Sequence, residues 1–252
     1  GANLNAYTSV DQTVYNIASV PIKRQEVLDS ALLILHDWCH GLLLTDKEID
    51  KERGVIHEEW RTRRAGKATQ RMMERVLPIV YRGTKYEDCL PIGSMDIVDH
   101  FPYHDLRDYY NKWYRPDLDA IIIVGDIRPA EVEAKIKQLF GTIPHPEHAA
   151  ERVYYPVADN DEIIVATDRD SEQPIMLATL FMKHNAVSDG EKNTIGYLRN
   201  SYIESLIVSM LNSRLQELQH QTVPPVLSAT AHSGSFLVSK TKDAFWLSFG
   251  CK

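Results

Sequence analysis

Two glutamates, Glu52 and Glu59, are the residues of this sequence whose types and spacing most suggest chemistry. They lie in the segment KERGVIHEEW at positions 51–60. In a helix, seven residues make about two turns and rise about 10 Å, so both carboxylates point to the same side. One carboxylate could ligate a metal ion while the other supports the site through hydrogen bonds. Charged helices that face water often carry the same spacing, so the spacing by itself favours a solvated helix face.

Three pairs of histidines also have spacings that a metal site could use. The pairs are His36 and His40, His100 and His104, and His145 and His148. The first pair has the i, i+4 spacing of a zinc-binding helix, but Asp37 stands where a glutamate base is required and no third ligand follows. Prolines interrupt the other two pairs, so their spacing is not helical. We therefore expect none of the three pairs to hold a metal ion.

The composition argues against two classes of function. The 252 residues carry a net charge of −7, and the only compact basic cluster, Arg61, Arg63, Arg64 and Lys67, is typical of a solvated helix face rather than of a nucleic-acid surface. No run of about 18 apolar residues is present, so we expect no membrane-spanning helix. The three cysteines are too widely spaced for a zinc knuckle or a disulfide framework. The sequence thus predicts a protein that binds neither nucleic acid nor membrane.

Apolar periodicity predicts mainly helices in the first part of the chain. Residues 4–17 alternate loosely and are typical of two strands joined by a turn. Helices are expected over 23–41, 45–64, 68–77, 103–113 and 129–140. Thr45 and Glu48 form a capping-box pattern that begins the second of these helices. The apolar run DAIIIVGDI at 119–127 predicts a buried strand.

A stretch with two prolines and no periodicity, residues 144–152, predicts a linker. Strands are expected after it at 162–167, 174–182, 235–239 and 244–250, and a long helix is expected to begin at the capping pair Ser188 and Glu191 and to run to about Leu218. The predicted fold class is α+β. Two α/β sandwich-like units, residues 1–143 and 153–252, would each consist of a mainly antiparallel sheet with helices layered on one face.

Five segments, in order along the chain, resemble the insulinase/pitrilysin family of zinc peptidases. Asn5-Ala-Tyr-Thr-Ser9 is similar to the family's Asn-Ala-x-Thr-Ser strand, and ERGVIHEEW to its Glu-Arg-x-x-x-x-x-Glu element. Tyr114-Arg-Pro-Asp117 and the following AIIIVGDI resemble the strand that closes the first catalytic subdomain. The remaining two segments are Pro91–Ser94 and Leu211–Glu217. The likeness extends over nearly the whole chain, and five elements in the right order are far more specific than any one of them.

The resemblance implies a zinc site to which this chain contributes one ligand. Glu59 corresponds to the third zinc ligand and Glu52 to a glutamate that supports the site, while Asn5 and Ala6 correspond to the edge strand that binds substrate. An inverted His-x-x-Glu-His motif supplies the two imidazole ligands and the general base in that family. The motif occurs nowhere in these 252 residues. The resemblance places it before the Asn-Ala strand, so we expect the general base upstream of Gly1 and no catalytic residue within this chain.

We therefore expect the chain to be a piece of a longer zinc-dependent endopeptidase and to be inactive by itself. Residues 1–143 would be the C-terminal part of the first peptidase subdomain, 144–152 a linker, and 153–252 an incomplete second subdomain. The parent would bind Zn²⁺ and would take a peptide substrate as an added edge strand. It would also need the remaining half of the peptidase, in the same chain or in a partner subunit. A bacterial periplasmic location is implied by the resemblance alone.

Two other functions stay open from the sequence. A non-catalytic assembly subunit on the same fold would bind partners instead of substrate, although such subunits often lose metal ligands and this chain keeps both Glu52 and Glu59. An unrelated α+β binding protein would carry the two glutamates by chance, exposed and far from any cleft. Residues upstream of position 1 would distinguish the first alternative from a peptidase.

Overall fold

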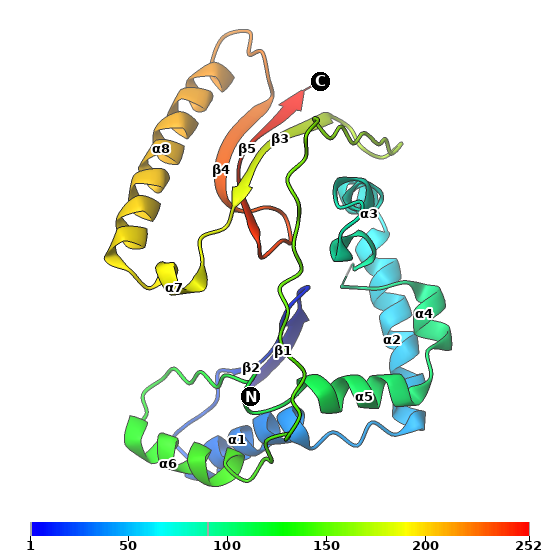
Figure 1. Ribbon diagram of the computed structural model, residues 1–252, viewed down its shortest axis with the longest axis vertical. Coiled ribbons are helices and arrows are strands. Elements are labelled where there is room, and N and C mark those ends of the chain that lie inside the picture. The colour runs from blue at the N-terminus through cyan, green and yellow to red at the C-terminus, as the bar shows by residue number, and fades with distance from the viewer. Residues whose placement is uncertain (1, 90, 252) are drawn as a thin grey trace. The chain divides into compact units, whose positions relative to one another are not determined.

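The computed structural model describes residues 2–89 and 91–251 (Figure 1). Gly1, before which the general base is expected, lies outside the described residues, so that expectation stays a prediction. The chain forms two compact units, one from residues 1–60 and 91–152 and the other from residues 61–90 and 153–252. Mixed helices and small antiparallel sheets confirm the predicted α+β class. No helix in the described part of the chain is both long enough and apolar enough to cross a membrane.

The first unit combines a two-stranded sheet with helices. Its elements are β1 (Asn3–Thr8), β2 (Thr13–Ala18), α1 (Gln25–His40), α2 (Asp46–Arg64), α4 (Met95–His100), α5 (Tyr103–Trp113) and α6 (Pro129–Phe140). β1 and β2 pair antiparallel, as the loose alternation over residues 4–17 predicts. Pro129 stands at the start of α6 and Gly141 ends it, in agreement with the sequence signals. Leu32, Ile49, Tyr110 and Val132 are buried in the interior of this unit.

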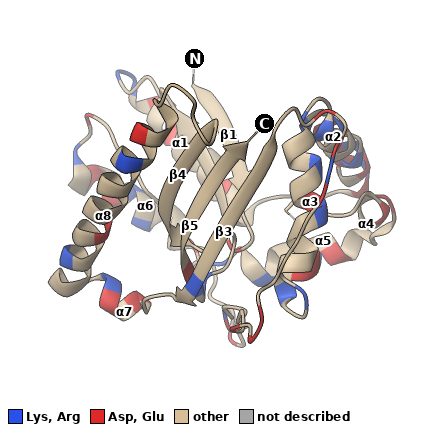
Figure 2. Cartoon of the chain, turned by 90° about the horizontal axis from the view of Figure 1, so that it is seen from above, with Lys and Arg blue, Asp and Glu red and all other residues tan. Residues whose placement is uncertain are grey.

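The second unit is built on a three-stranded antiparallel sheet in the order β3-β5-β4. Its elements are α3 (Ala68–Val80), the 3₁₀ turn η1 (Lys85–Asp88), β3 (Met176–Asn185), α7 (Asp189–Lys192), α8 (Ile195–Gln219), β4 (Ser228–Ser235) and β5 (Lys242–Cys251). Charged residues on this sheet gather at one end, where Lys183, Lys242 and Asp243 lie (Figure 2). Small side chains allow close packing on the sheet, and Ala229, Ala231 and Ala244 are buried there.

Tyr81 explains why residues 61–90 group with the C-terminal part of the chain. Its side chain is 0% exposed, and its hydroxyl donates to the Phe236 carbonyl at 2.7 Å and accepts from the Val238 amide at 3.0 Å. Burial raises the pKa of Tyr81 to about 12, so the hydroxyl stays a donor at neutral pH. Arg71 adds an ion pair to Asp170 at 2.7 Å. These compact units divide the chain differently from the domains expected at 1–143, 144–152 and 153–252, which stay a prediction.

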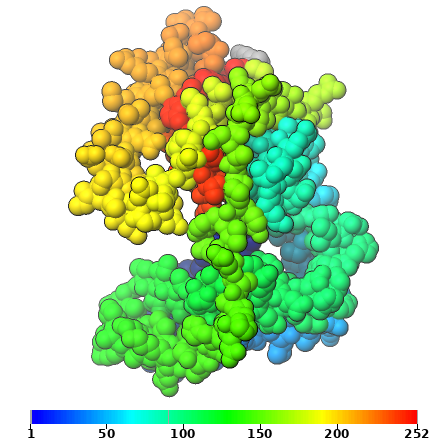
Figure 3. Space-filling model, viewed as in Figure 1, coloured from blue at the N-terminus to red at the C-terminus, as the bar shows by residue number. Residues whose placement is uncertain are grey.

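Two apolar runs expected to be strands form none. Residues 119–127 and 162–167 belong to no strand and pair with no strand within the described residues. Ile122 and Val124 are 84% and 92% exposed, Ile163 and Val165 are 85% and 73% exposed, and the stretch around residues 160–167 lies at the surface (Figure 3). A strand needs backbone partners on a neighbouring segment. An apolar run can supply the side chains for a strand but cannot supply that neighbour.

Two further expectations need correction in the second unit. The capping box of Ser188 and Glu191 is present, but it opens only the short helix α7, because Asn193 ends that helix and Thr194 caps α8 separately. Residues 235–239, expected as a strand, lie mainly in the turn that joins β4 to β5, where Leu237 has a φ of 53°. The strand of this region is β4, which ends at Ser235, where the expected strand would begin.

Candidate functional site

Helix α2 carries both candidate glutamates. The Glu48 amide donates to Thr45 Oγ1 at 3.4 Å at its start, so the Thr45 half of the predicted capping box is present. Acidic residues in the first turn and basic residues in the last turn complement the helix dipole. Glu52 is exposed and Glu59 is half-buried. Seven residues on a helix correspond to a turn of about 700°, so the two side chains leave the axis within about 20° of each other.

Strand β1 presents an open hydrogen-bonding edge at Ala6. The hairpin turn is closed by the Ser9 amide, which donates to the Gln12 carbonyl at 2.9 Å. Because bonded and non-bonded pairs alternate along an antiparallel ladder, the backbone of Asn5 is bonded to Asn16, and the backbone groups of Ala6 point to the open edge. No strand other than β2 pairs with β1 among the described residues.

A cluster of aromatic hydroxyls anchors this hairpin through β2. Tyr15 and Tyr114 share a hydrogen bond of 2.7 Å between their hydroxyls, and the Tyr15 ring lies 5.3 Å from the Trp38 ring. Burial is the largest cause that raises the pKa of Tyr15, and the bond to Tyr114 adds to it. The cluster therefore stays neutral at physiological pH and holds β2 against α1 without charge.

Asp119 is the acid next to this cluster with the most altered environment. Desolvation by burial, followed by the nearby carboxylate of Asp117, raises the pKa of Asp119 to about 6, while His40 opposes the shift. Burial likewise raises the pKa of the Cys39 thiol to about 11, so Cys39 is not a reactive thiolate. The charge of Asp119 therefore changes in a mildly acidic range.

The histidine pairs are not assembled into a metal centre. His36 contacts Asp37 and the ring of Phe140, and His100 contacts the Asp96 carbonyl. His57, between the two glutamates in sequence, bonds Asp99 at 2.6 Å instead. No group of three His, Cys, Asp or Glu side chains that could hold a metal ion exists in the part of the chain that the structure describes.

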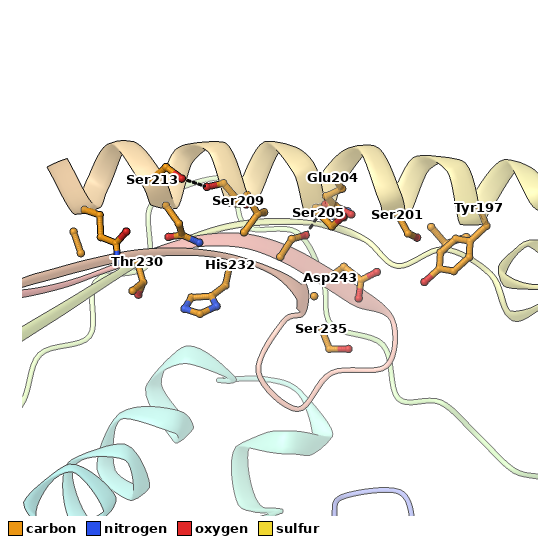
Figure 4. A pocket seen from close by; sticks show the side chains of 18 of the residues that line it. Tyr197, Ser201, Glu204, Ser205, Ser209, Ser213, Thr230, His232, Ser235 and Asp243 are labelled. Carbon is orange, nitrogen blue, oxygen red and sulfur yellow. Dashed lines mark hydrogen bonds between the residues drawn. The ribbon is translucent and has the colours of Figure 1, made fainter. Parts of the chain in front are cut away.

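A groove of about 1130 Å³ lies in the second unit between α8 and β4 (Figure 4). Side chains that include Tyr197, Ser201 and Ser209 line it from α8. Ser233 on β4 donates a hydrogen bond of 2.5 Å to Glu204 of the helix. The apolar periodicity of α8 does not predict this groove, because several of its apolar residues are exposed, such as Leu198 at 68%. The polar residues of the helix, spaced at three and four, were the available signal.

Two amides of α8 occupy the edge of β4. The Asn212 side chain donates to the Ala231 carbonyl at 2.9 Å and accepts from the Ala231 amide at 2.7 Å. Two turns further along the helix, Gln219 donates to the Ala229 carbonyl at 3.0 Å. Asn212 thereby fills both hydrogen-bonding positions that an additional strand would use at Ala231.

Comparison with known proteins identifies the class of protein. Residues 1–90 match the family model of the insulinase family (peptidase family M16), and residues 100–239 match the model of the peptidase M16 inactive domain. The chain therefore belongs to the insulinase family of peptidases, family M16.

Several of the relatives that it resembles are named as zinc proteases. The chain is 32% identical over 238 residues to the probable zinc protease PqqL of Escherichia coli, an alignment that covers 92% of this chain and 24% of that protein. The crystal structure of the first half of the periplasmic protease PqqL from Escherichia coli superposes with a TM-score of 0.82 at 29% identity, over 99% of this chain and 52% of that one. Pitrilysin shares the fold, with a TM-score of 0.67 at 17% identity, over 100% of this chain and 26% of that one. The chain thus spans about a quarter of the length of the curated relatives it matches.

Zinc, the metal named for these relatives, does not fit the described residues taken alone. Protein zinc sites use three or four ligands, of which catalytic sites leave one position for water. Glu59 would offer one carboxylate, and the nearest histidine in sequence, His57, is held by Asp99. The described residues by themselves therefore do not form a catalytic zinc site.

Proposed function

We propose that this chain is part of a zinc-dependent endopeptidase and contributes one metal ligand, Glu59, and one supporting carboxylate, Glu52. The observation that carries the proposal is that both glutamates project from the same side of α2 in a member of family M16. The two imidazole ligands and the general base would come from residues upstream of Gly1.

The proposed substrate is an unstructured peptide that adds to β1 as a third strand. Ala6 would donate and accept the backbone hydrogen bonds, and Asn5 would border the same subsite. Main-chain bonds give affinity with little demand on the substrate's sequence. A folded protein without a free segment could not place an extended strand there, so peptides or flexible protein segments are the proposed substrates.

The proposed setting follows the relatives. The Escherichia coli relative is described as periplasmic, and we propose the same location for the parent of this chain. Its full catalytic centre would also require the remaining half of the peptidase.

The test uses the full-length parent with Glu59→Gln, Glu52→Gln and, as a control, Glu131→Gln. Glu131 lies exposed on α6 and pairs with Arg128 in the same helix turn. We expect Glu59→Gln to lose stoichiometric zinc and with it nearly all of kcat/KM, because a site with three protein ligands loses one. Glu52→Gln should weaken zinc binding by about 10- to 100-fold. The control should match the wild type.

Failure of the wild-type parent to bind zinc and to cleave any unstructured peptide would contradict the proposal. That result would favour a non-catalytic assembly subunit on the same fold. Equal zinc binding by wild type and Glu59→Gln would contradict the assignment of the ligand alone.

A further inference from the structure

Arg53, next to Glu52 in α2, is clamped onto the α4–α5 corner, which we define as residues 98–103. Its guanidinium donates to the Val98 carbonyl and, at 2.9 Å, to the Phe101 carbonyl. It also lies 4.0 Å from the centre of the Phe101 ring. The Arg53 side chain is only 14% exposed. A planar fork that bonds two carbonyls and stacks on a ring fixes both position and orientation, which a lysine cannot reproduce.

Two further residues of α2 contact the same corner. His57, one turn after Arg53, bonds Asp99 at 2.6 Å. Asp50, one turn before it, accepts a hydrogen bond of 2.8 Å from the Tyr103 hydroxyl and also pairs with Arg53 at 3.2 Å. Three consecutive turns of α2 are therefore attached to one short segment, with Arg53 at the centre and the least exposed of the three.

The clamp and the glutamates occupy different sides of the helix. At about 100° per residue, Asp50, Arg53 and His57 fall within about 60° of one another around the axis. Glu52 and Glu59 lie roughly 100–180° away from that group. Any rotation of α2 about its axis would stretch the clamp and would move both carboxylates in the opposite direction.

We infer that Arg53 is a positioning residue, which sets the rotation of α2 and thereby the direction of Glu59. The inference rests on the proposed function of Glu59. A carboxylate stands roughly 6 Å from a helix axis, so a rotation of about 20° displaces it by about 2 Å. Functional groups must be held within about 0.5 Å of their working geometry. Small losses of rotational restraint therefore matter more at Glu59 than at an ordinary surface residue.

The experiment compares Arg53→Met, Arg53→Lys and the control Arg128→Met in the full-length parent. Arg128 is 83% exposed and lies in the same unit, at the start of α6. Zinc affinity is measured by competition with a chromophoric chelator, kcat and KM with a quenched peptide, and backbone mobility by hydrogen exchange over residues 48–60. We expect Arg53→Met to weaken zinc affinity at least about 10-fold and to lower kcat by about 10- to 100-fold, because a misplacement of about 1 Å can cost 100-fold. KM should stay within about twofold, because β1 is untouched.

Arg53→Lys should recover part of the loss, since one of the two carbonyl bonds can re-form, and Arg128→Met should equal the wild type. Faster exchange over 48–60 is expected in Arg53→Met alone, whether or not the parent binds zinc. Unchanged exchange would overturn the inference. A lower melting temperature with unchanged zinc affinity and kcat would also overturn it, because Arg53 would then serve stability alone. A wild-type parent without zinc, combined with faster exchange in Arg53→Met, would instead remove the proposed function and keep the clamp.

Discussion

The edge strands β1 of the first unit and β4 of the second unit differ in what their outward backbone groups bond. In the first unit, β1 pairs only with β2 among the described strands, and Ala6 directs its backbone groups outward. In the second unit, Asn212 and Gln219 of α8 bond the outward groups of Ala231 and Ala229. An unprotected edge is a template for another chain, whereas a covered edge is not.

The difference indicates which edge is available to a peptide without rearrangement. A strand that adds at Ala6 meets backbone groups that no described strand occupies. A strand that adds at Ala231 must first displace a side-chain amide that already makes two hydrogen bonds. Exposed edges invite aggregation, so natural proteins cover those that have no use. We therefore expect peptide binding at β1 and not at β4.

The largest expected effect is the loss of zinc binding and peptide cleavage when residues 1–252, with their open β1 edge, are separated from the rest of the catalytic centre. Residues 1–252 alone should bind no zinc tightly and should cleave no peptide, because Glu59 supplies one carboxylate and the His-x-x-Glu-His motif is missing. Calorimetric zinc titration and a quenched-peptide assay check this, on this chain and on a chain extended upstream to include the motif. Tight one-to-one zinc binding or chelator-sensitive cleavage by residues 1–252 would contradict the prediction.

The second largest effect is expected from proline in place of Ala6, which tests whether a peptide binds at the β1 edge. Ala6→Pro removes the outward N–H and leaves the substrate's carbonyl without a partner, a loss of about 1–3 kcal/mol. The kcat/KM of the parent should fall by about 100-fold. Ala6→Ser keeps the N–H at similar size and should retain most of the activity. Equal activity of the two variants would show that substrate does not add at β1.

Asn212→Leu tests the covered edge. The isosteric leucine leaves the Ala231 amide and carbonyl without their partner, so we expect the free energy of unfolding in urea to fall by about 2 kcal/mol. Ser213→Ala is the matched control on the next residue of α8, where the hydroxyl bonds the Ser209 carbonyl of its own helix. If both variants unfold at the same urea concentration, the amide does not protect the edge.

Tyr15→Phe tests how much the Tyr15–Tyr114 hydrogen bond contributes to the stability of the β1–β2 hairpin. It removes the 2.7 Å bond to Tyr114 and should lower the free energy of unfolding by about 1 kcal/mol. Tyr109→Phe, at a side chain that is 59% exposed, is the control and should have little effect. A loss of the same size in both variants would mean that the hydroxyl pair does not anchor the hairpin.

Asp119 predicts a small pH effect in the first unit. Its folded pKa of about 6 lies above the ordinary value near 4, so the folded state holds the proton more tightly. Stability should therefore decline as the pH rises from about 4 to 6. The decline should be only about 1 kcal/mol, because Asp119 is partly open to solvent, which screens the effect. Asp119→Asn should flatten that part of the curve of unfolding free energy against pH. A slope unchanged in the variant would assign it to another group.

The sequence predicted the elements that carry the site because their signals are local. The cap of α2 at Thr45 and the seven-residue spacing of its glutamates depend only on neighbouring residues, and so does the β1–β2 hairpin. The segments with which a strand pairs over long distances in the chain could not be predicted from the sequence. The run at 119–127 has strand-like side chains, yet strand formation depends on a neighbour that no pattern within the run identifies.

The α8–β4 groove was missed for a different physical reason. Apolar periodicity normally marks the buried face of a helix. In α8 the side that meets β4 mixes apolar residues with polar ones, and two of the polar ones, Asn212 and Gln219, bond backbone groups of β4. The side-chain amides of Asn212 and Gln219 thus help to determine how α8 packs on β4. In the sequence alone, such an amide cannot be distinguished from one that faces water.

The hydrogen bond between Tyr81 and Phe236 has a consequence for folding during synthesis on the ribosome. The two residues are 155 positions apart, and the intervening chain includes more than half of the first unit. At about 5–20 residues per second, Tyr81 emerges roughly 8–30 s before Phe236. Throughout that interval, the Tyr81 hydroxyl lacks the Phe236 and Val238 backbone groups that it bonds in the folded protein. A chaperone that binds nascent chains would therefore find a target around Tyr81, and synonymous codons that slow synthesis between Tyr81 and Phe236 should increase misfolding.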